Sequence, residues 1–183
     1  MKKVLFVCFV GLISACSLAK FTNYPGQAVH EFPQKMQGTY FYILNVSLLG
    51  NHKSGDTLFY QITPNSVIII DSMKHTEKKL DSSFVLSLVK QKYWILSYKD
   101  SEMPDYWNCM MYSANKKGLQ IFPIIEEKQN TKLQKYFGYK PILDANKDTL
   151  MIYSASDEQM AKYLKKEVKE TIKLKRLQIN TAK

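Results

Sequence analysis

The stretch Phe84-Val-Leu-Ser-Leu-Val89, Lys90-Gln-Lys92, Tyr93-Trp-Ile-Leu-Ser-Tyr98 decides the fold class of this chain. Two runs rich in aliphatic, β-branched and aromatic residues, the types that favour strands, flank a short polar turn. We therefore expect two neighbouring antiparallel strands here. Similar runs recur on both sides of them.

Three strand-forming runs precede this pair: Gly38–Leu44, Thr57–Ile62 and Ser66–Ile70. Thr63-Pro64-Asn65 predicts a hairpin between the last two, because proline presets the first corner of a turn and asparagine tolerates the second. Val67–Ile70 has no polar alternation, so it should be buried on both faces or central in its sheet. The lysine-rich segment 71–82 is either a long hairpin end or a short strand.

Two further runs follow the pair, Tyr106–Tyr112 and Leu119–Ile125. Pro123 cannot donate to a strand ladder, so its strand should be at an edge or bulged there. Short strands at intervals of about 8–14 residues are typical of an antiparallel meander. We therefore predict a mainly β protein, an antiparallel meander forming a barrel or two-layer sandwich, with one or two helices near the C-terminus.

The first helix is predicted at Thr131–Phe137, capped by Asn130, with Gly138 in the left-handed conformation beyond its end and Pro141 shortly after. The second should begin at Ser156-Asp-Glu-Gln159, a capping box with acids in its first turn. Apolar and lysine residues then fall on opposite faces of it: Met160, Tyr163, Leu164 and Val168 on one, Lys162, Lys165, Lys166 and Lys169 on the other.

Strands should flank this second helix, at Thr149–Tyr153 and at Thr171–Ile179. The last run shifts phase near Arg176, which indicates a bulge or an end there. Gly38-Thr39-Tyr40 resembles the G-x-W start of the lipocalins, with tyrosine in place of tryptophan. That resemblance implies an eight-stranded barrel that holds an apolar ligand.

The first sixteen residues have the layout of an export signal. Lys2 and Lys3 are followed by an apolar run, Val4–Ile13, which is too short to span a bilayer. Ile13-Ser14-Ala15-Cys16 resembles the lipobox of bacterial lipoproteins, which implies cleavage before Cys16 and a diacylglycerol on its sulfur. Two alternatives remain open: cleavage after Ala19 with ordinary secretion, and an uncleaved apolar anchor.

On the lipobox interpretation the chain has three parts: a signal peptide at 1–15, a lipidated N-terminus and tether at 16–37, and a single β-rich domain at 38–183. No period is sustained between Ser17 and Gln37, so we expect an irregular tether there. A tether of about fifteen extended residues would reach roughly 50 Å.

The cysteines agree with this division. Cys8 leaves with the signal and Cys16 carries lipid, so Cys109 is left alone and no internal disulfide is expected. Cys109 lies in the apolar run Tyr106–Tyr112, where burial as a small hydrophobic residue is expected rather than a role as nucleophile.

The formal charge is +10, of which the signal lysines contribute two, and Arg176 is the only arginine among 26 basic residues. Nucleic-acid sites favour the forked guanidinium, so we expect no nucleic-acid partner. The spread lysines indicate a solvated surface, weakly attracted to anionic lipid headgroups.

Residues that could bind a metal ion or act as a catalytic acid or base are scattered along the sequence. His30, His52 and His75 are isolated, so no metal site is predicted, and solvated loop histidines are the default. Asp144-Ala-Asn146-Lys-Asp148 has ligand types at alternate positions but lacks the glycine and closing glutamate of an EF-hand, which favours a turn. Glu126 and Glu127 would point to opposite faces of a strand.

The sequence also lacks a G-x-S-x-G elbow, a Walker loop and a dinucleotide fingerprint, so no catalytic residue and no cofactor are predicted. Aromatic residues are plentiful, and pairs such as Tyr40 with Tyr42 and Trp94 with Tyr98 fall on one strand face. Core packing is the default explanation, and a ligand-lining or glycan-binding surface is the alternative.

We therefore expect a non-enzymatic lipoprotein of a bacterial cell envelope, attached to the outer membrane if the cell is Gram-negative. Its membrane partner is reached through the lipid on Cys16. Its function should be binding, either of a small apolar ligand or glycan, or of another envelope protein as a structural or assembly partner.

Overall fold

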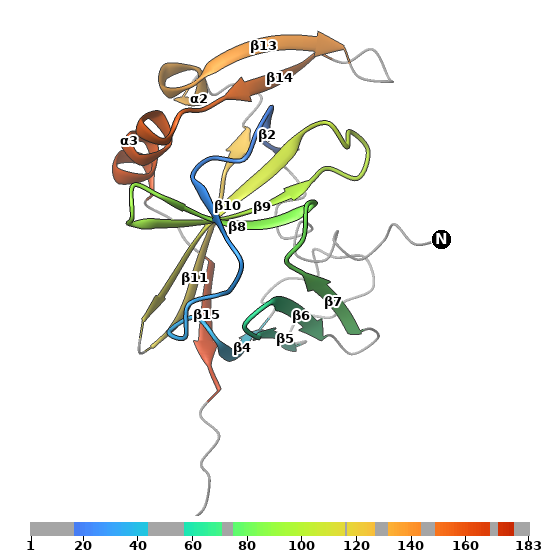
Figure 1. Cartoon of the computed structure of the whole chain (residues 1–183), viewed down its shortest axis with the longest axis vertical. Coiled ribbons are helices and arrows are strands. Elements are labelled where there is room, and N and C mark those ends of the chain that lie inside the picture. Colours follow the sequence, from blue (N-terminus) through green and yellow to red (C-terminus); the bar gives the residue numbers. More distant parts are fainter. Residues whose placement is uncertain are drawn as a thin grey trace, which may run out of the picture.

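The computed structural model describes residues 17–43, 57–70, 75–115, 117–126, 132–143, 149–168 and 172–177. The predicted fold class is confirmed: the protein is mainly β, an antiparallel sheet curled into a half-barrel, with two short helices near the C-terminus (Figure 1). No described helix is long and apolar enough to span a bilayer.

The central meander runs through nine strands that are neighbours in the order β8-β9-β10-β11-β15-β4-β5-β6-β7. Their bounds are β4 Gly38–Ile43, β5 Thr57–Ile62, β6 Ser66–Ile70, β7 His75–Lys79, β8 Phe84–Val89, β9 Tyr93–Lys99, β10 Trp107–Asn115, β11 Gly118–Pro123 and β15 Ile172–Arg176. Every pair along this path is antiparallel.

The remaining strands lie around this meander. They are β1 Ser17–Leu18, β2 Lys20–Phe21, β3 Gln27–Val29, β12 Ile125–Glu126, β13 Gly138–Leu143 and β14 Thr149–Ser154. β3 pairs with β8, and β1 pairs with β12 as a separate two-stranded sheet. β2 joins β10 to β14, and β13 pairs with β14. The β13–β14 hairpin lies at the top of Figure 1.

The hairpin that decides the fold class is present as predicted. β8 and β9 pair from Phe84 opposite Tyr98 to Val89 opposite Tyr93. Lys90 and Gln91 turn the chain with φ of 48° and 54°, a left-handed conformation that non-glycine residues seldom adopt.

The predicted hairpin of β5 and β6 is also confirmed, with Ile62 opposite Val67. β6 lies between β5 and β7, which explains its continuous apolar sequence. The lysine-rich segment before Phe84 contains the short strand β7, one of its two predicted forms.

The prediction of a tether over residues 16–37 is wrong from Leu18 onward. Phe21, Phe32 and Met36 are fully buried in the core of the domain. The segment showed no period because its apolar residues fill separate core positions, between short strands and turns, instead of one face of one element.

The left-handed conformation predicted for Gly138 is also wrong. The first helix, α2 (Lys132–Tyr136), is followed directly by β13, which begins at Gly138 without a positive φ. A Cβ on Gly138 would lie 2.8 Å from the side-chain oxygen of Ser154, its partner on β14, so the glycine permits a close strand approach. The predicted cap, Asn130, lies outside the described residues.

The second helix, α3 (Asp157–Glu167), has the predicted capping box. The Ser156 side chain accepts from the Gln159 backbone N–H, and the Gln159 side chain accepts from that of Ser156. Met160, Tyr163 and Leu164 are buried, whereas the described lysines of the opposite face are exposed.

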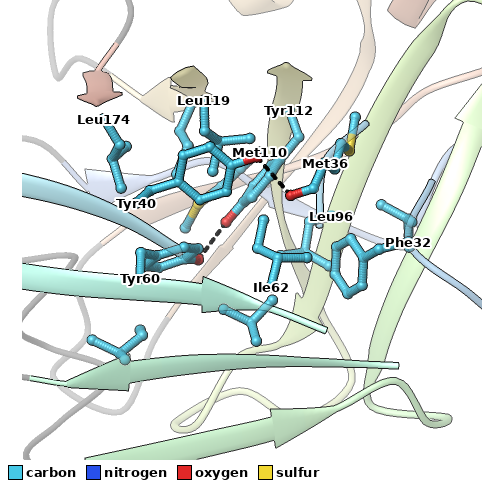
Figure 2. Packing of buried hydrophobic residues seen from close by; sticks show 14 of the residues in the cluster. Phe32, Met36, Tyr40, Tyr60, Ile62, Leu96, Met110, Tyr112, Leu119 and Leu174 are labelled. Carbon is cyan, nitrogen blue, oxygen red and sulfur yellow. Dashed lines mark hydrogen bonds between the residues drawn. The ribbon is translucent and has the colours of Figure 1, made fainter. Parts of the chain in front are cut away.

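The central strands separate two hydrophobic clusters. Along β10, Met110 and Tyr112 point to the inner cluster, enclosed by the curled meander, and Cys109 and Met111 point to the outer cluster. The outer cluster lies beneath α2, α3 and β14. Figure 2 shows part of the inner cluster, in which Tyr40, Tyr60 and Tyr112 converge among aliphatic side chains.

Arg176 lies where β15 pairs with β4, a contact of only two residue pairs. Its Nη2 donates to the carbonyl oxygens of Lys35 and Gln37, both at 2.9 Å, and to Tyr40 Oη at 2.8 Å. β15 ends at Arg176, as the phase shift predicted. The edge position predicted for the strand of Pro123 is wrong, because β11 lies between β10 and β15; Pro123 is tolerated at the end of β11, beyond its pairing with β15.

Candidate functional site

Cys16, the predicted lipidation site, lies outside the described residues. The adjacent Ser17 is in β1, so the described domain begins one residue after it. The lipidation of Cys16 stays a prediction.

Cys109 is buried, as predicted. Its side chain lies in the outer cluster, and its Sγ is 3.4 Å from Ser97 Oγ. Burial raises the pKa of the thiol to about 12. The thiol is therefore protonated at neutral pH and shielded from reagents, which makes it a packing residue rather than a nucleophile.

The candidate metal ligands do not come together in the part of the chain that the structure describes. No three His, Cys, Asp or Glu side chains there are close enough to hold a metal ion. His30 and His75 are exposed, as the default for solvated histidines predicted. His52, Glu127 and the segment 144–148 lie outside the described residues.

The seam between β6–β7 and β8–β9 is where the sheet does not close, and a small cavity opens there. Its volume is about 20 Å³, and its lining is mainly apolar, with Tyr60, Tyr98 and Tyr112 among the residues. A cavity of this size has room for about one water molecule. The aromatic residues of the predicted strand faces serve the core instead: Tyr40, Tyr42, Trp94 and Tyr98 all belong to the inner cluster or pack against it.

The tyrosine hydroxyls at this cavity are neutral groups. Tyr60 Oη and Tyr112 Oη are 2.6 Å apart and share a hydrogen bond. Burial raises the pKa of both side chains, and of Tyr98, above the ordinary tyrosine value. Tyr60 and Tyr112 satisfy each other inside the core, and none of the three hydroxyls is ionised at neutral pH.

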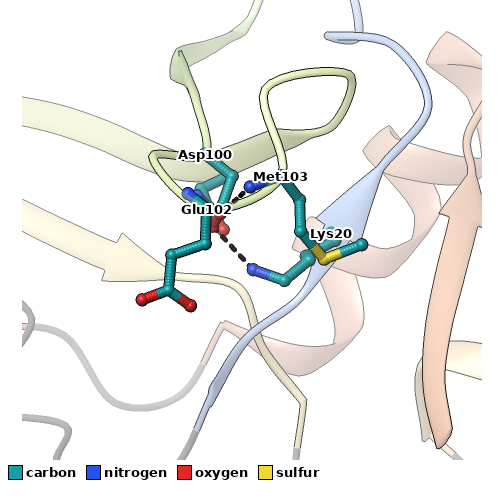
Figure 3. Close-up of polar contacts among 5 residues, drawn as sticks. Lys20, Asp100, Glu102 and Met103 are labelled. Atoms are coloured by element: carbon teal, nitrogen blue, oxygen red, sulfur yellow. Dashed lines mark hydrogen bonds and ion pairs between the residues drawn. The ribbon is translucent and has the colours of Figure 1, made fainter. Parts of the chain in front are cut away.

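A polar cluster braces the loop between β9 and β10 (Figure 3). Lys20 Nζ lies 2.6 Å from Asp100 Oδ2, which also accepts from the Asn108 side chain at 2.9 Å. Asp100 Oδ1 accepts from the backbone N–H groups of Glu102 and Met103, both at 2.9 Å.

Burial alone would raise the pKa of Asp100, but the hydrogen bonds from Asn108 and Lys20 and the charge of Lys20 outweigh it and lower the pKa. Asp100 is therefore ionised, and its contacts tie β2 to the β9–β10 loop.

The remaining candidate is the edge strand β13. Among the described strands it pairs only with β14. Tyr139 and Leu143 are 50% and 68% exposed, unusually high values for large apolar side chains in a strand. Edge strands with exposed apolar side chains are sites where another chain adds as a strand.

The hydrogen-bonding groups of β13 also point outward. Tyr153 lies opposite Tyr139, and its carbonyl accepts from the Thr22 N–H on the far side of β14 at 2.9 Å. Since Tyr153 therefore faces away from β13, Tyr139 faces away from β14, and Pro141 and Leu143 follow at a spacing of two. Pro141, which has no N–H, fits this outward position.

Exposed lysines lie on β13, on α2, which directly precedes it, and on α3, which packs against α2. They are Lys132 and Lys135 on α2, Lys140 on β13, and Lys162, Lys165 and Lys166 on α3. The acids of the same elements are engaged within the protein. Asp157 Oδ1 accepts from the Gly26 N–H at 2.8 Å, Glu158 pairs with Lys90 at 3.2 Å, and Glu167 accepts from the Tyr136 hydroxyl at 2.7 Å.

Sequence patterns did not predict this edge, because Gly138 and Pro141 also fit the end of a helix. A usable signal was present: two short runs with apolar residues, at 139–143 and 149–153, flank a five-residue loop rich in aspartate and asparagine. Comparisons with family models, curated proteins and solved structures found no match to this chain.

Proposed function

We propose that this protein is a lipid-anchored component of a bacterial cell envelope, attached through Cys16, and that it acts by binding another envelope protein at β13. The export signal supports the location in the cell envelope, and the lipobox resemblance supports the lipid on Cys16. The observation that carries the binding mode is the outward-facing, apolar and lysine-flanked edge of β13.

A partner at this edge is an extended segment that adds as a strand. The carbonyl groups of Tyr139, Pro141 and Leu143 and the N–H groups of Tyr139 and Leu143 are placed to receive it. Its apolar residues would cover the side chains of Tyr139 and Leu143. Its other residues should be acidic, because Lys140 on β13 and the lysines of α2, which directly precedes it, are exposed.

The same charges disfavour a second copy of the chain as the occupant. Two β13 edges side by side would bring Lys140 of both copies together, and like charges destabilise such a pairing. The seam cavity gives less support to a small apolar ligand or glycan. At about 20 Å³ it is far below the several hundred cubic ångströms typical of ligand pockets.

The anchor is tested with a Cys16→Ser variant. The wild-type protein should fractionate with membranes, its mature mass should include the lipid, and the variant should lose both properties. Membrane association of the variant, together with a wild-type mass without lipid, would contradict the anchor.

The binding mode is tested with a ten-residue peptide of alternating valine and glutamate, fluorescently labelled and titrated by anisotropy. We expect saturable binding that weakens with salt and is lost when every peptide nitrogen is methylated, because methylation then removes the strand hydrogen bonds of both peptide edges. Equal binding of the methylated peptide, or of a valine–lysine peptide, would overturn the proposal.

A matched pair of charge reversals locates the site. Lys140→Glu on β13 should weaken binding about two- to ten-fold, the range expected for one or a few exposed charge contacts. Lys79→Glu, on the opposite edge strand β7, makes the same change in net charge and should leave binding unchanged. Equal effects of the two substitutions would show that the peptide responds to overall charge only.

A further inference from the structure

The strands β4, β5 and β6 carry apolar side chains on both faces of their sheet. Those of one face, such as Tyr40, Tyr60 and Ile69, belong to the inner cluster. The alternate residues point to the opposite face, and neither hydrophobic cluster contains any of them. We call this opposite face, continued onto β15, the β4–β6 face. Its apolar residues are Phe41, Ile43, Phe59, Ile68, Ile70 and Leu177.

These apolar side chains are neighbours across the strands. Phe41 lies opposite Phe59, and Phe59 lies opposite Ile70, so the three form one row across the sheet. Ile43 on β4 and Ile68 on β6 extend this row at a spacing of two residues. Ile43 is 46% exposed, and the other four are half-buried. A contiguous apolar patch of this kind marks an interaction site.

Among the described elements, no helix covers the β4–β6 face. In Figure 1, α2 and α3 lie in the upper half of the molecule over the outer cluster, whereas β4, β5 and β6 lie at the bottom. A further strand cannot add within this face, because β15 and β6 are already paired on both edges. The elements that can cover a sheet face are a helix or a second sheet.

The dimensions and the charge of the face favour a helix with acidic residues. Three strands about 4.8 Å apart give an apolar width of about 10 Å, which is the diameter of a helix. None of the strands β15, β4, β5 and β6 contains an acidic residue. Lys173 and Lys175 are exposed and alternate with the inward-pointing Leu174, so they border the face, with Lys175 opposite Phe41.

We propose that the β4–β6 face binds an amphipathic helix of another protein. Its apolar stripe lies over Phe41, Phe59 and Ile70, and its acidic residues lie on the flank above Lys173 and Lys175. A second copy of the chain fits less well, because stacking two faces brings together two chains of net positive charge. This surface is separate from β13 and does not depend on the lipid.

A designed peptide tests the proposal. It has 18 residues, is stapled as a helix, and carries one leucine stripe with glutamates on one flank. It is titrated by fluorescence anisotropy against residues 16–183 with Cys16→Ser, a chain that retains every described residue and needs no detergent. We expect saturable binding that weakens with salt. A peptide with the same residues in scrambled order, or with lysine in place of glutamate, should bind at least ten-fold more weakly.

Two matched substitutions of exposed aliphatic residues locate the site. Ile43→Asp should weaken binding of the helical peptide about ten-fold or more and leave the valine–glutamate strand peptide unaffected. Leu143→Asp on β13 should do the reverse, so failure of this proposal and failure of the β13 proposal are distinguishable. Leu177→Asp, at a residue 41% exposed on the same face, replaces Ile43→Asp if that variant does not fold.

The proposal is overturned if the helical peptide does not bind, or if Ile43→Asp and Leu143→Asp affect its binding equally. Two further measurements test other occupants of the face. A dimer in sedimentation velocity that Ile43→Asp dissociates would assign the face to a second copy. Binding to phosphatidylglycerol vesicles that Ile43→Asp abolishes would assign it to lipid. Either of these results would also overturn the proposal.

Discussion

The two faces of the central strands β8, β9 and β10 are both fully covered, but by different means. The inner face is enclosed by other strands of the same meander, and it contains the hydrogen-bonded pair Tyr60 and Tyr112. The outer face is covered by α2, α3 and β14 and depends on aromatic packing, with the ring of Phe137 lying 5.5 Å from Phe21 and 5.2 Å from Tyr163.

This difference separates the part that closes the sheet from the part that is available for recognition. The inner cover is made by strands whose own edges are paired or charged, as in β7 with its sequence His-Thr-Glu-Lys-Lys. The outer cover ends in β13, an exposed edge with apolar side chains. The C-terminal elements therefore complete the core on one side and present the proposed binding edge on the other.

The largest expected effect comes from deleting a large side chain on either face. Phe21→Ala on the outer face should lower the free energy of unfolding by about 3–5 kcal/mol, and Leu86→Ala on the inner face by about 2–5 kcal/mol, since both residues are fully buried. Urea unfolding measures both losses.

The two tryptophans show whether the faces unfold together. Trp94 packs against the inner cluster and Trp107 belongs to the outer one, so Trp107→Phe and Trp94→Phe each leave one reporter. We expect coincident unfolding midpoints in the Phe21→Ala background. An earlier midpoint for Trp107 would show that the helical cover unfolds separately.

A smaller effect is expected for the polar pair of the inner face. Tyr60→Phe removes the described hydrogen-bond partner of the buried Tyr112 hydroxyl and should cost about 1–3 kcal/mol. The pair also predicts a pH dependence, because burial raises the pKa of both tyrosines in the folded state.

The sign of that dependence follows from the unfolded chain. The tyrosines of the unfolded chain release protons above about pH 10, whereas the folded pair keeps them. The contribution of the pair to the free energy of unfolding is therefore fully present below about pH 10 and falls as the pH rises above it. Tyr60→Phe should flatten this decline, measured as the change in unfolding midpoint between about pH 8 and pH 11. An unchanged slope would show that the pair does not set the alkaline limit.

The smallest changes in the free energy of unfolding are expected for single polar contacts on the inner and outer sides of the central strands. Arg176→Lys on the inner side should cost about 1–2 kcal/mol, because lysine cannot reproduce the guanidinium contacts with Lys35, Gln37 and Tyr40. Glu158→Gln on the outer side breaks an exposed pair with Lys90 and should change the stability by less than about 0.5 kcal/mol. Equal costs would contradict the difference between the covers.

Local sequence patterns predicted the elements whose partners are near in the chain. The β8–β9 and β5–β6 hairpins, the capping box of α3 and the end of β15 at Arg176 each depend on residues within a few positions of one another. The strands β1, β2 and β3 could not be predicted in this way, because they are two or three residues long and are stabilised by partners far along the chain.

The candidate site was predicted less well than the fold. Cys16 and the burial of Cys109 depend on local sequence, whereas the edge of β13 depends on which strands remain unpaired after folding. Pro141 illustrates the problem: the same residue marks a helix end or an edge strand, and only the position of β14 beside it decides.

If the chain is exported and lipidated as we propose, the pairing of β1 with β12 sets the order of events during export. Ser17 and Ile125 are separated by more than a hundred residues, so β1 can be fixed only after most of the domain has been translocated and has begun to fold. A peptidase that cuts before Cys16 needs the adjoining backbone extended and accessible. Lipid attachment and cleavage should therefore precede the docking of β1, and a domain that folded first would hide its own processing site.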